Sequence, residues 1–174
     1  MKFHHLIVVI TSVLICISCE QNTSQLVDKE ATLKFNSWLD YIWDQQVARS
    51  PEWQGYLAID KNKDKWDDYS EKRRAEELVL TKRNLQLLQD SFNIEHLESV
   101  AQVSYELFEK KCQDEIEAYQ FRTYGYPVNQ MFGMQSHLPS FLINFHQVET
   151  TRDAEDYISR LSGIKQVLDQ VTLN

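Results

Sequence analysis

Residues 123–148 read TYGYPVNQMFGMQSHLPSFLINFHQV and contain no Asp, Glu, Lys or Arg, although 25% of the whole sequence is charged. Two of the three prolines and two of the four glycines lie in this uncharged segment. Such a segment can be buried with an irregular backbone, provided that its polar groups find hydrogen-bond partners. We therefore expect it to lie against the hydrophobic core or to line a cleft, with one short irregular or extended stretch around residues 126–136.

Two interpretations of the uncharged segment stay open. It can be a buried crossover between helices, whose amides bond to one another, or it can face a ligand. In the second case its amide and imidazole side chains would make the polar contacts. The candidates for contact with a substrate or partner are Asn129, Gln130, Gln135 and His137.

The chain on both sides of this segment has the hydrophobic spacing of amphipathic helices. Ser50, Ser70 and Thr150 precede three of these stretches and are candidate N-caps. We predict a mainly α fold, a helical bundle-like region with a possible strand at residues 128–134. The predicted helices cover residues 30–49, 51–57, 71–90, 139–147 and 150–162, and another runs to residue 122 from either Asn93 or Ser99. A further helix begins at Ile164 because Gly163 should break the pattern.

Length and charge narrow the class of protein. The 174 residues suffice for about one domain. The net charge of −8 disfavours nucleic acid as a partner. Cys112 is alone in the chain after residue 19, so no internal disulfide framework is available, and it lies in a helical pattern that predicts a packed, unreactive thiol.

Residues 1–18 have the pattern of a signal peptide. The apolar run from Leu6 to Ile17 has twelve residues, too few for the roughly 20 that span a bilayer. Residues 16–19 read CISC and resemble a bacterial lipobox, which implies lipidation of Cys19. Because Glu20 rather than Asp follows, the resemblance implies an outer-membrane lipoprotein facing the periplasm. Polar residues 19–30 would form the tether, and residues 31–174 a helical domain.

The stretch from Asp60 to Glu71 imitates a calcium-binding loop. Acidic or amide residues stand at most of the EF-hand ligand positions, but Lys65 replaces the glycine that the sharp turn requires, and Lys61 and Lys63 add positive charge. We predict a solvated loop between helices, with a bound calcium ion as the alternative.

The sequence shows no catalytic or metal-binding motif. The metallopeptidase pattern H-E-x-x-H, phosphate-binding loops, nucleophile elbows and C-x-x-C pairs are absent. His96, His137 and His146 have no other His or Cys at metal-binding spacing. We therefore assign no catalytic residue, metal or cofactor to this chain, and whether it belongs to an enzyme stays open.

Several motifs, in order along the chain, resemble the N-terminal part of the bacterial family called domain of unknown function 885. They occupy residues 35–38, 48–52, 64–68, 126–130, 133, 135–136, 138–142, 146–148 and 153–161. The resemblance covers nearly the whole chain after the signal peptide. It also interprets the calcium-like loop as a family feature with no implied ion.

Members of that family are longer exported proteins, often lipoproteins, that look like zinc-dependent peptidases. Their H-E-x-x-x-G-H type motif has no match in this sequence. The resemblance therefore implies a non-catalytic N-terminal region that is inactive alone, with residues 129–136 near the substrate cleft of the complete enzyme. Zinc is expected in a complete member, and the expected partners are a C-terminal half, a peptide and the membrane that holds the anchor.

A second reading is a stand-alone periplasmic binding or interaction module anchored to the outer membrane, with the uncharged segment as its partner-binding face. The first interpretation requires a C-terminal half that completes the protein, and the second does not. The last amphipathic pattern has no stop signal before Asn174, so we expect a truncated or split gene product.

Overall fold

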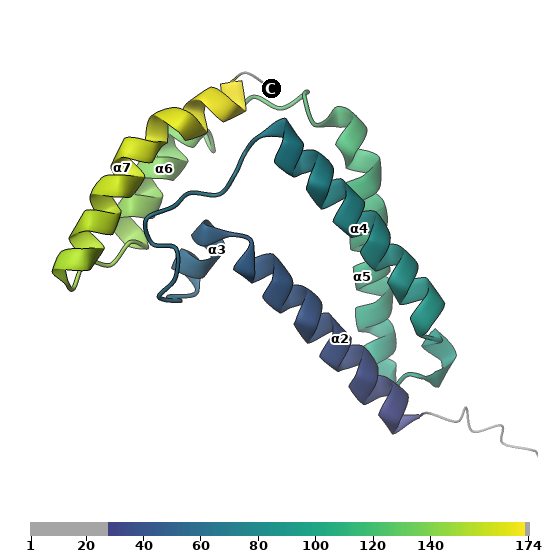
Figure 1. Cartoon of the computed structure of the whole chain (residues 1–174). Coiled ribbons are helices and arrows are strands. Elements are labelled where there is room, and N and C mark those ends of the chain that lie inside the picture. The colour runs from purple at the N-terminus through teal and green to yellow at the C-terminus, as the bar shows by residue number, and fades with distance from the viewer. Residues whose placement is uncertain (1–27, 173–174) are drawn as a thin grey trace, which may run out of the picture.

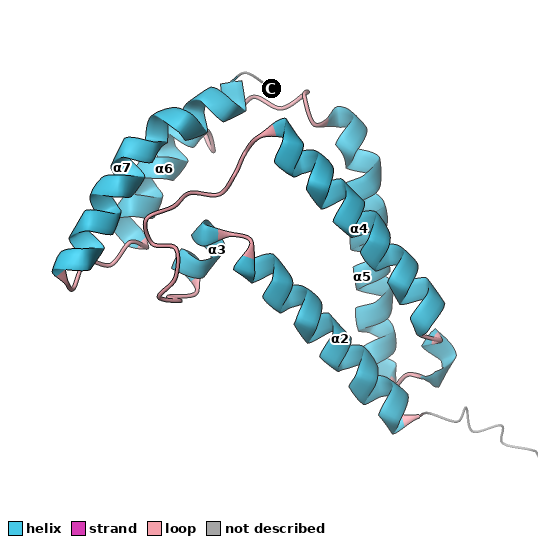
Figure 2. Cartoon of the chain, viewed as in Figure 1, coloured by secondary structure: helices cyan, strands magenta, loops and turns pink. Residues whose placement is uncertain are grey.

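The structure is a computed structural model that describes residues 28–172, and all regular elements in this range are helices (Figure 2). The prediction of a mainly α fold is confirmed. The strand candidate, residues 128–134, is not a strand: residues 128–133 form turns and irregular backbone, and Met134 begins a helix. The predicted signal peptide and Cys19 lie outside the described residues. The elements are α2 (Lys29–Ala48), α3 (Pro51–Tyr56), α4 (Glu71–Ser91), η1 (Ile94–His96), α5 (Ser99–Ala118), η2 (Tyr119–Phe121), α6 (Met134–Asn144) and α7 (Thr151–Thr172).

The helices form two groups that are joined by a short helix and a loop. Figure 1 shows α4 and α5 as an antiparallel pair with α2 beside them, and α6 and α7 as a second pair on the other side. The short helix α3 and residues 57–70 run between the two groups. This middle region positions the residues that are of functional interest.

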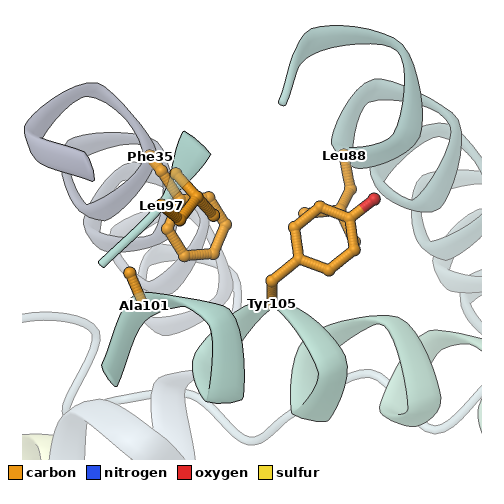
Figure 3. Packing of buried hydrophobic residues seen from close by; sticks show 5 residues of the cluster. All are labelled: Phe35, Leu88, Leu97, Ala101 and Tyr105. Carbon is orange, nitrogen blue, oxygen red and sulfur yellow. The ribbon is translucent and has the colours of Figure 1, made fainter. Parts of the chain in front are cut away.

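The hydrophobic core of the first group lies where α2, α4 and α5 converge. Phe35, Leu88, Leu97, Ala101 and Tyr105 are buried and pack as one cluster (Figure 3). Trp38, Phe92 and Phe108 surround it, and the rings of Phe35 and Phe92 meet edge to face at 5.3 Å. The aromatic face predicted for the first helix is therefore core packing.

A second buried cluster anchors α6 and α7 to the middle of the molecule. Leu138 and Phe141 of α6 and Val167 of α7 are each at most 2% exposed. The Phe141 ring lies 5.3 Å from that of Trp66, in the loop, and 5.2 Å from that of Tyr56, at the end of α3. Burial of these large side chains holds the two groups together.

The predicted helix caps are confirmed. Ser50 Oγ accepts a hydrogen bond from the Trp53 amide at 3.0 Å, and Ser70 Oγ accepts one from the Arg73 amide at 3.2 Å. At the start of α7, the Thr150 amide donates to Asp153 Oδ2 at 2.8 Å and the Asp153 amide donates to Thr150 Oγ1 at 3.2 Å. This reciprocal pair is a capping box.

Two predicted helix boundaries are wrong. The chain does not break at Gly163, which lies inside the continuous α7. A Cβ atom there would lie 3.0 Å from Cδ1 of Trp66, so the glycine allows the indole to approach the helix. Helix α6 begins at Met134 rather than at Pro139, and Pro139 lies inside it at the cost of one backbone hydrogen bond.

The uncharged segment is half buried and half exposed. Its second half, which holds Leu138, Phe141, Leu142 and His146, is part of the second buried cluster, as expected. In its first half, Tyr124 is 75% exposed, Tyr126 is 83% exposed and Phe132 is 84% exposed. The expected burial against the core is therefore wrong for these exposed side chains.

Candidate functional site

Three of the predicted contact residues lie in the exposed loop of residues 123–133 or just after it. Asn129 Oδ1 accepts hydrogen bonds from the amides of Met131 at 3.0 Å and Phe132 at 2.8 Å, and its amide group donates to the Tyr126 carbonyl at 3.2 Å. The Gln135 side chain donates to the Asn129 carbonyl. Asn129 and Gln135 thus fix the loop's own backbone, while Gln130 is exposed on its surface.

The fourth predicted residue, His137, contacts a buried carboxylate. His137 Nε2 lies 2.7 Å from Glu52 Oε2, and Glu52 is 4% exposed. Because the carboxylate accepts this hydrogen bond, Nε2 carries the hydrogen. The His137 side chain is 30% exposed. An imidazole that is oriented by a buried carboxylate can exchange a hydrogen bond with a bound group at its open nitrogen.

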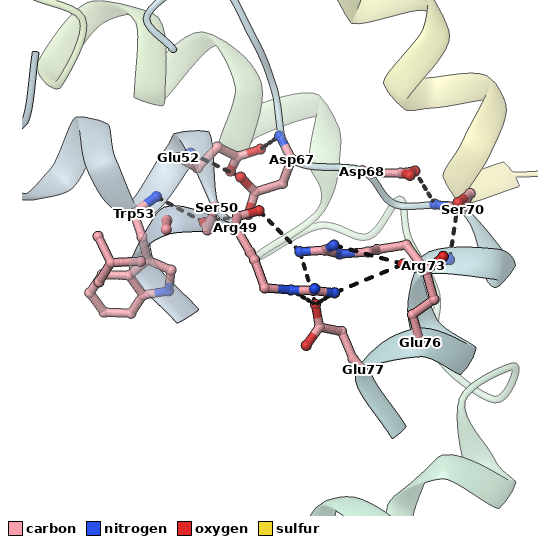
Figure 4. Close-up of polar contacts among 12 residues, drawn as sticks. Arg49, Ser50, Glu52, Trp53, Asp67, Asp68, Ser70, Arg73, Glu76 and Glu77 are labelled. Carbon is pink, nitrogen blue, oxygen red and sulfur yellow. Dashed lines mark hydrogen bonds and ion pairs between the residues drawn. The ribbon is translucent and has the colours of Figure 1, made fainter. Parts of the chain in front are cut away.

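Glu52, in the first turn of α3, is the centre of a polar cluster. The sequence pattern does not predict this cluster. Tyr69 Oη donates to Glu52 Oε1 at 2.9 Å, and the Asp67 amide donates to the same oxygen at 3.4 Å. In return the Glu52 amide donates to Asp67 Oδ1 at 2.9 Å, and Ser50 Oγ donates to Asp67 Oδ2 at 2.6 Å (Figure 4). The cluster ties α3 to residues 67–69 of the loop.

Burial and like charge determine the electrostatics of this cluster. Burial is the largest cause of the raised pKa of Asp67, against the hydrogen bonds from Glu52 and Ser50 that lower it. Burial and the neighbouring Glu52 carboxylate also raise the pKa of the Tyr69 hydroxyl, so Tyr69 stays a hydrogen-bond donor at neutral pH.

Arg160 of α7 is a second buried centre, and it was also missed in the sequence. It is 1% exposed, and its Nε donates to the Lys65 carbonyl at 2.9 Å. Its Nη2 donates to the carbonyls of Pro51 at 3.3 Å and Asn62 at 3.4 Å. Burial lowers the pKa of the guanidinium, and the surrounding carboxylates, Glu52 first, oppose that effect.

His146 links Arg160 to the start of α7. Its Nε2 lies 3.0 Å from the Asp153 carbonyl, and its Nδ1 lies 3.1 Å from Nη1 of Arg160. A carbonyl oxygen accepts and a guanidinium donates, so Nε2 carries the hydrogen and Nδ1 accepts. Asp153 in turn forms an ion pair with Lys63, and this hydrogen bond is the largest cause of the lowered pKa of the Asp153 carboxyl.

The calcium-like loop does not gather its acidic side chains around one point. The Asp60 side chain is 91% exposed, Asp68 accepts from the Ser70 amide at 2.9 Å, and Trp66 packs into the second buried cluster. The carbonyls of Asn62 and Lys65 accept from the Arg160 guanidinium. The oxygen atoms of this loop are therefore not arranged around a calcium ion. The cation that its carbonyls contact is the guanidinium of Arg160.

The short motifs singled out in the sequence meet in this region. Ser50 and Glu52 belong to one motif, Trp66 and Asp67 to a second, His146 to a third and Arg160 to a fourth, and each contacts another of the set at the distances given above. Trp66 Nε1 also donates to the Arg160 carbonyl at 2.7 Å. The motifs therefore form a junction between α3, the loop of residues 57–70, α6 and α7.

Other features of the described residues bear on catalysis and on location. Within residues 28–172, no three His, Cys, Asp or Glu side chains are placed to hold a metal ion. The Cys112 thiol is buried, and burial raises its pKa to about 11, so it is a packed side chain rather than a nucleophile. In the same range, no helix has the length and apolarity that crossing a bilayer requires.

Comparison with known proteins gives one family. The family described as "Bacterial protein of unknown function (DUF885)" matches residues 51–174. No curated protein and no solved structure matches the chain.

Proposed function

This chain belongs to the bacterial DUF885 family, and from that premise we propose that it is the N-terminal, non-catalytic region of an exported, lipid-anchored protein similar to zinc-dependent peptidases. In this proposal the metal and the catalytic base come from a separate C-terminal half. The chain itself supplies a rigid helical support and the outer wall of the substrate cleft.

One observation carries the proposal: the exposed apolar surface of the loop at residues 124–132. Tyr126, Met131 and Phe132 are 83%, 67% and 84% exposed, and no charged residue lies among them. A run of exposed apolar and aromatic side chains of this kind is typical of a region that another protein segment covers. The half-exposed His137 follows this loop in α6, which would place it at the edge of the covered surface.

The proposal is tested by finding and adding the missing half. We expect a reading frame beside this gene to encode a protein with an H-E-x-x-x-G-H motif. The two proteins, purified together, should form a complex that binds zinc and cleaves short peptides until a chelator is added. A neighbouring sequence with no such frame, or a complex that binds no zinc, would contradict the proposal.

The role of the exposed loop in that complex is tested by substitution. Phe132→Ser should weaken association with the C-terminal half by roughly tenfold or more, because a large aromatic anchor is lost from the interface. Val79→Ser is the matched control, since Val79 is a 65% exposed apolar residue of α4, outside the loop. Equal affinities of the two variants would argue against the loop as the interface.

The alternative is a stand-alone binding module anchored to the outer membrane. It is favoured by the satisfied interior: every buried side-chain nitrogen and oxygen of the described residues has a hydrogen-bond partner. A stand-alone module should be monomeric, melt cooperatively and bind no hydrophobic dye. Aggregation or strong dye binding would instead support the first proposal, because an uncovered interface exposes apolar surface.

A further inference from the structure

A row of half-exposed aromatic rings runs from α2 across α3 to the end of α6. Trp43, Trp53, Tyr56 and Phe145 are 47%, 50%, 40% and 42% exposed. Neighbouring ring centroids lie 5.7 Å apart for Trp43 and Trp53, 6.0 Å for Trp53 and Tyr56, and 4.5 Å for Tyr56 and Phe145. This aromatic row belongs neither to the core cluster of α2, α4 and α5 nor to the exposed loop of residues 123–133.

The rings of the aromatic row hold one another in place. Consecutive rings meet edge to face, at interplanar angles of 72°, 72° and 73°. Aromatic side chains have few rotatable bonds, and each ring here is buttressed by the next, so little conformational entropy is lost when a ligand binds to them. Figure 4 shows the Trp53 indole pointing away from the cluster of Arg49, Arg73 and Glu77.

One end of the aromatic row borders a polar hollow. Tyr56 and Phe145 line a hollow of about 550 Å³ whose other walls include Lys63, Asn144 and Asp153. This volume is within the range of ligand-binding pockets, roughly 300–1,000 Å³. A ligand that lies along the row could therefore place one unit in the hollow.

The hollow is lined by three acidic side chains (Asp60, Glu149 and Asp153) and three basic ones (Lys63, Arg152 and Arg160), so its formal charges balance. Lys63 pairs with Asp153, and the Arg160 guanidinium is held by backbone carbonyls and His146. Asp60 and Arg152, at the rim, have side chains that are 91% and 87% exposed and so are strongly hydrated. A charged ligand would find no buried counter-charge, whereas a neutral ligand could bond to the amides of Asn144 and Gln147, which line the same hollow.

We infer that the aromatic row and the hollow together bind a neutral oligosaccharide. A pyranose ring has an apolar C–H face, which packs on an aromatic ring, and an edge of hydroxyl groups, which bond to amides and carbonyls. Linked sugar units of this kind fit a row of rings that leads into a polar hollow whose three acidic and three basic side chains balance in formal charge. This inference does not depend on the proposed peptidase-like half.

An extended peptide is the rival ligand, and the structure favours it less. Extended peptides commonly bind by adding a strand to the edge of a sheet, and residues 28–172 contain no strand. A proline-rich peptide, which docks on aromatic rings without such pairing, is the form of peptide that the test has to include.

The test uses the purified full-length chain and measures titration by calorimetry and by tryptophan fluorescence, because Trp43 and Trp53 lie in the row. The probes are cellotetraose, maltotetraose, tetra-N-acetylchitotetraose and a proline-rich decapeptide. We expect saturable binding of at least one tetrasaccharide. Trp53→Ala should weaken it by roughly tenfold, and Trp53→Phe, which keeps an aromatic face, should weaken it less.

Two controls separate binding from folding. Tyr41→Ala removes an aromatic residue of α2 that is 58% exposed and lies outside the row, and it should leave the affinity unchanged. The helical content and melting temperature of each variant are measured, and Tyr56→Ala provides an independent position if Trp53→Ala does not fold. The inference is overturned if no tetrasaccharide binds, if binding survives both alanine substitutions in the row, or if the proline-rich peptide alone binds.

Discussion

Arg160 and Asp153 show how single residues fix the junction between the two helix groups. No carboxylate within residues 28–172 lies within ion-pair distance of Arg160, and its guanidinium bonds to three backbone carbonyls and His146. Asp153 caps α7 and pairs with Lys63 of the loop. Each side-chain nitrogen of Arg160 has a hydrogen-bond partner, and removal of one partner would leave a buried charged group unsatisfied, which is strongly destabilising.

At neutral pH, Asp153→Asn should lower the free energy of unfolding, because the ion pair with Lys63 is lost. The pKa of the Asp153 carboxyl is lowered below its ordinary value of 3.8 in the folded chain. Its contribution is therefore fully present above the unfolded pKa and disappears as the pH falls through the folded pKa. Urea unfolding at several pH values should show the gap between wild type and variant closing below about pH 4.

Asp169→Asn is the control for this prediction. Asp169 pairs with Lys165 on the surface of α7, where the two side chains are 52% and 83% exposed, so its loss should change the stability little. A gap between wild type and Asp153→Asn that stays constant from pH 7 to pH 3 would show that the charge of Asp153 is not what stabilises the junction.

At the scale of elements, helix α7 shows why a local signal misled the sequence prediction. Glycine is unfavourable inside a helix by about 1 kcal/mol relative to alanine. The local sequence therefore predicts a helix break at Gly163. In the fold it leaves room for Trp66, which lies about 100 residues earlier and donates to the Arg160 carbonyl. The reason for the glycine is a tertiary contact that no local pattern contains.

Gly163→Val should therefore destabilise the chain by about 1–3 kcal/mol, because its side chain meets the Trp66 ring. Gly125→Val is the matched control, since an added Cβ at Gly125 meets nothing within 4 Å. Chemical unfolding of both variants measures the difference. Equal stabilities would mean that Trp66 can move aside without cost.

Features that depend on local sequence signals could be predicted, whereas features that depend on tertiary contacts could not. The caps at Ser50, Ser70 and Thr150 and the spacing of apolar residues were sufficient to locate most helices, because those signals are local. The junction was not predictable residue by residue, since Glu52 and Arg160 look like ordinary helix-surface charges in the sequence. Asn129 and Gln135 are predicted contacts to a substrate or partner, and in the structure they bond to the backbone of their own loop.

At the scale of the whole molecule, two helix groups are joined through contacts far apart in the sequence. The loop of residues 57–70 and the helix α3 lie between the groups, and the exposed loop of residues 123–133 links α5 and η2 to α6 (Figure 1). Phe141 of α6 packs against Trp66 of the loop, and polar contacts join His137 of α6 to Glu52 and Arg160 of α7 to Pro51. These contacts hold α6 and α7 against α3 and the loop. The relative placement of the groups therefore rests on side chains as well as on the connecting backbone.

Because these contacts hold the two helix groups together, the loop of residues 123–133 can be cleaved while the two fragments remain associated. Chymotrypsin cleaves after aromatic residues that are not followed by proline, and Tyr124 and Phe132 are exposed there. We expect brief digestion to give two fragments that still elute as one species in gel filtration, because His137, Phe141 and Arg160 remain bound to the other piece. If the fragments separate, the contacts across the junction are too weak to hold the groups together. If they stay paired, the gene could be divided at this loop and its two products would reassemble by themselves.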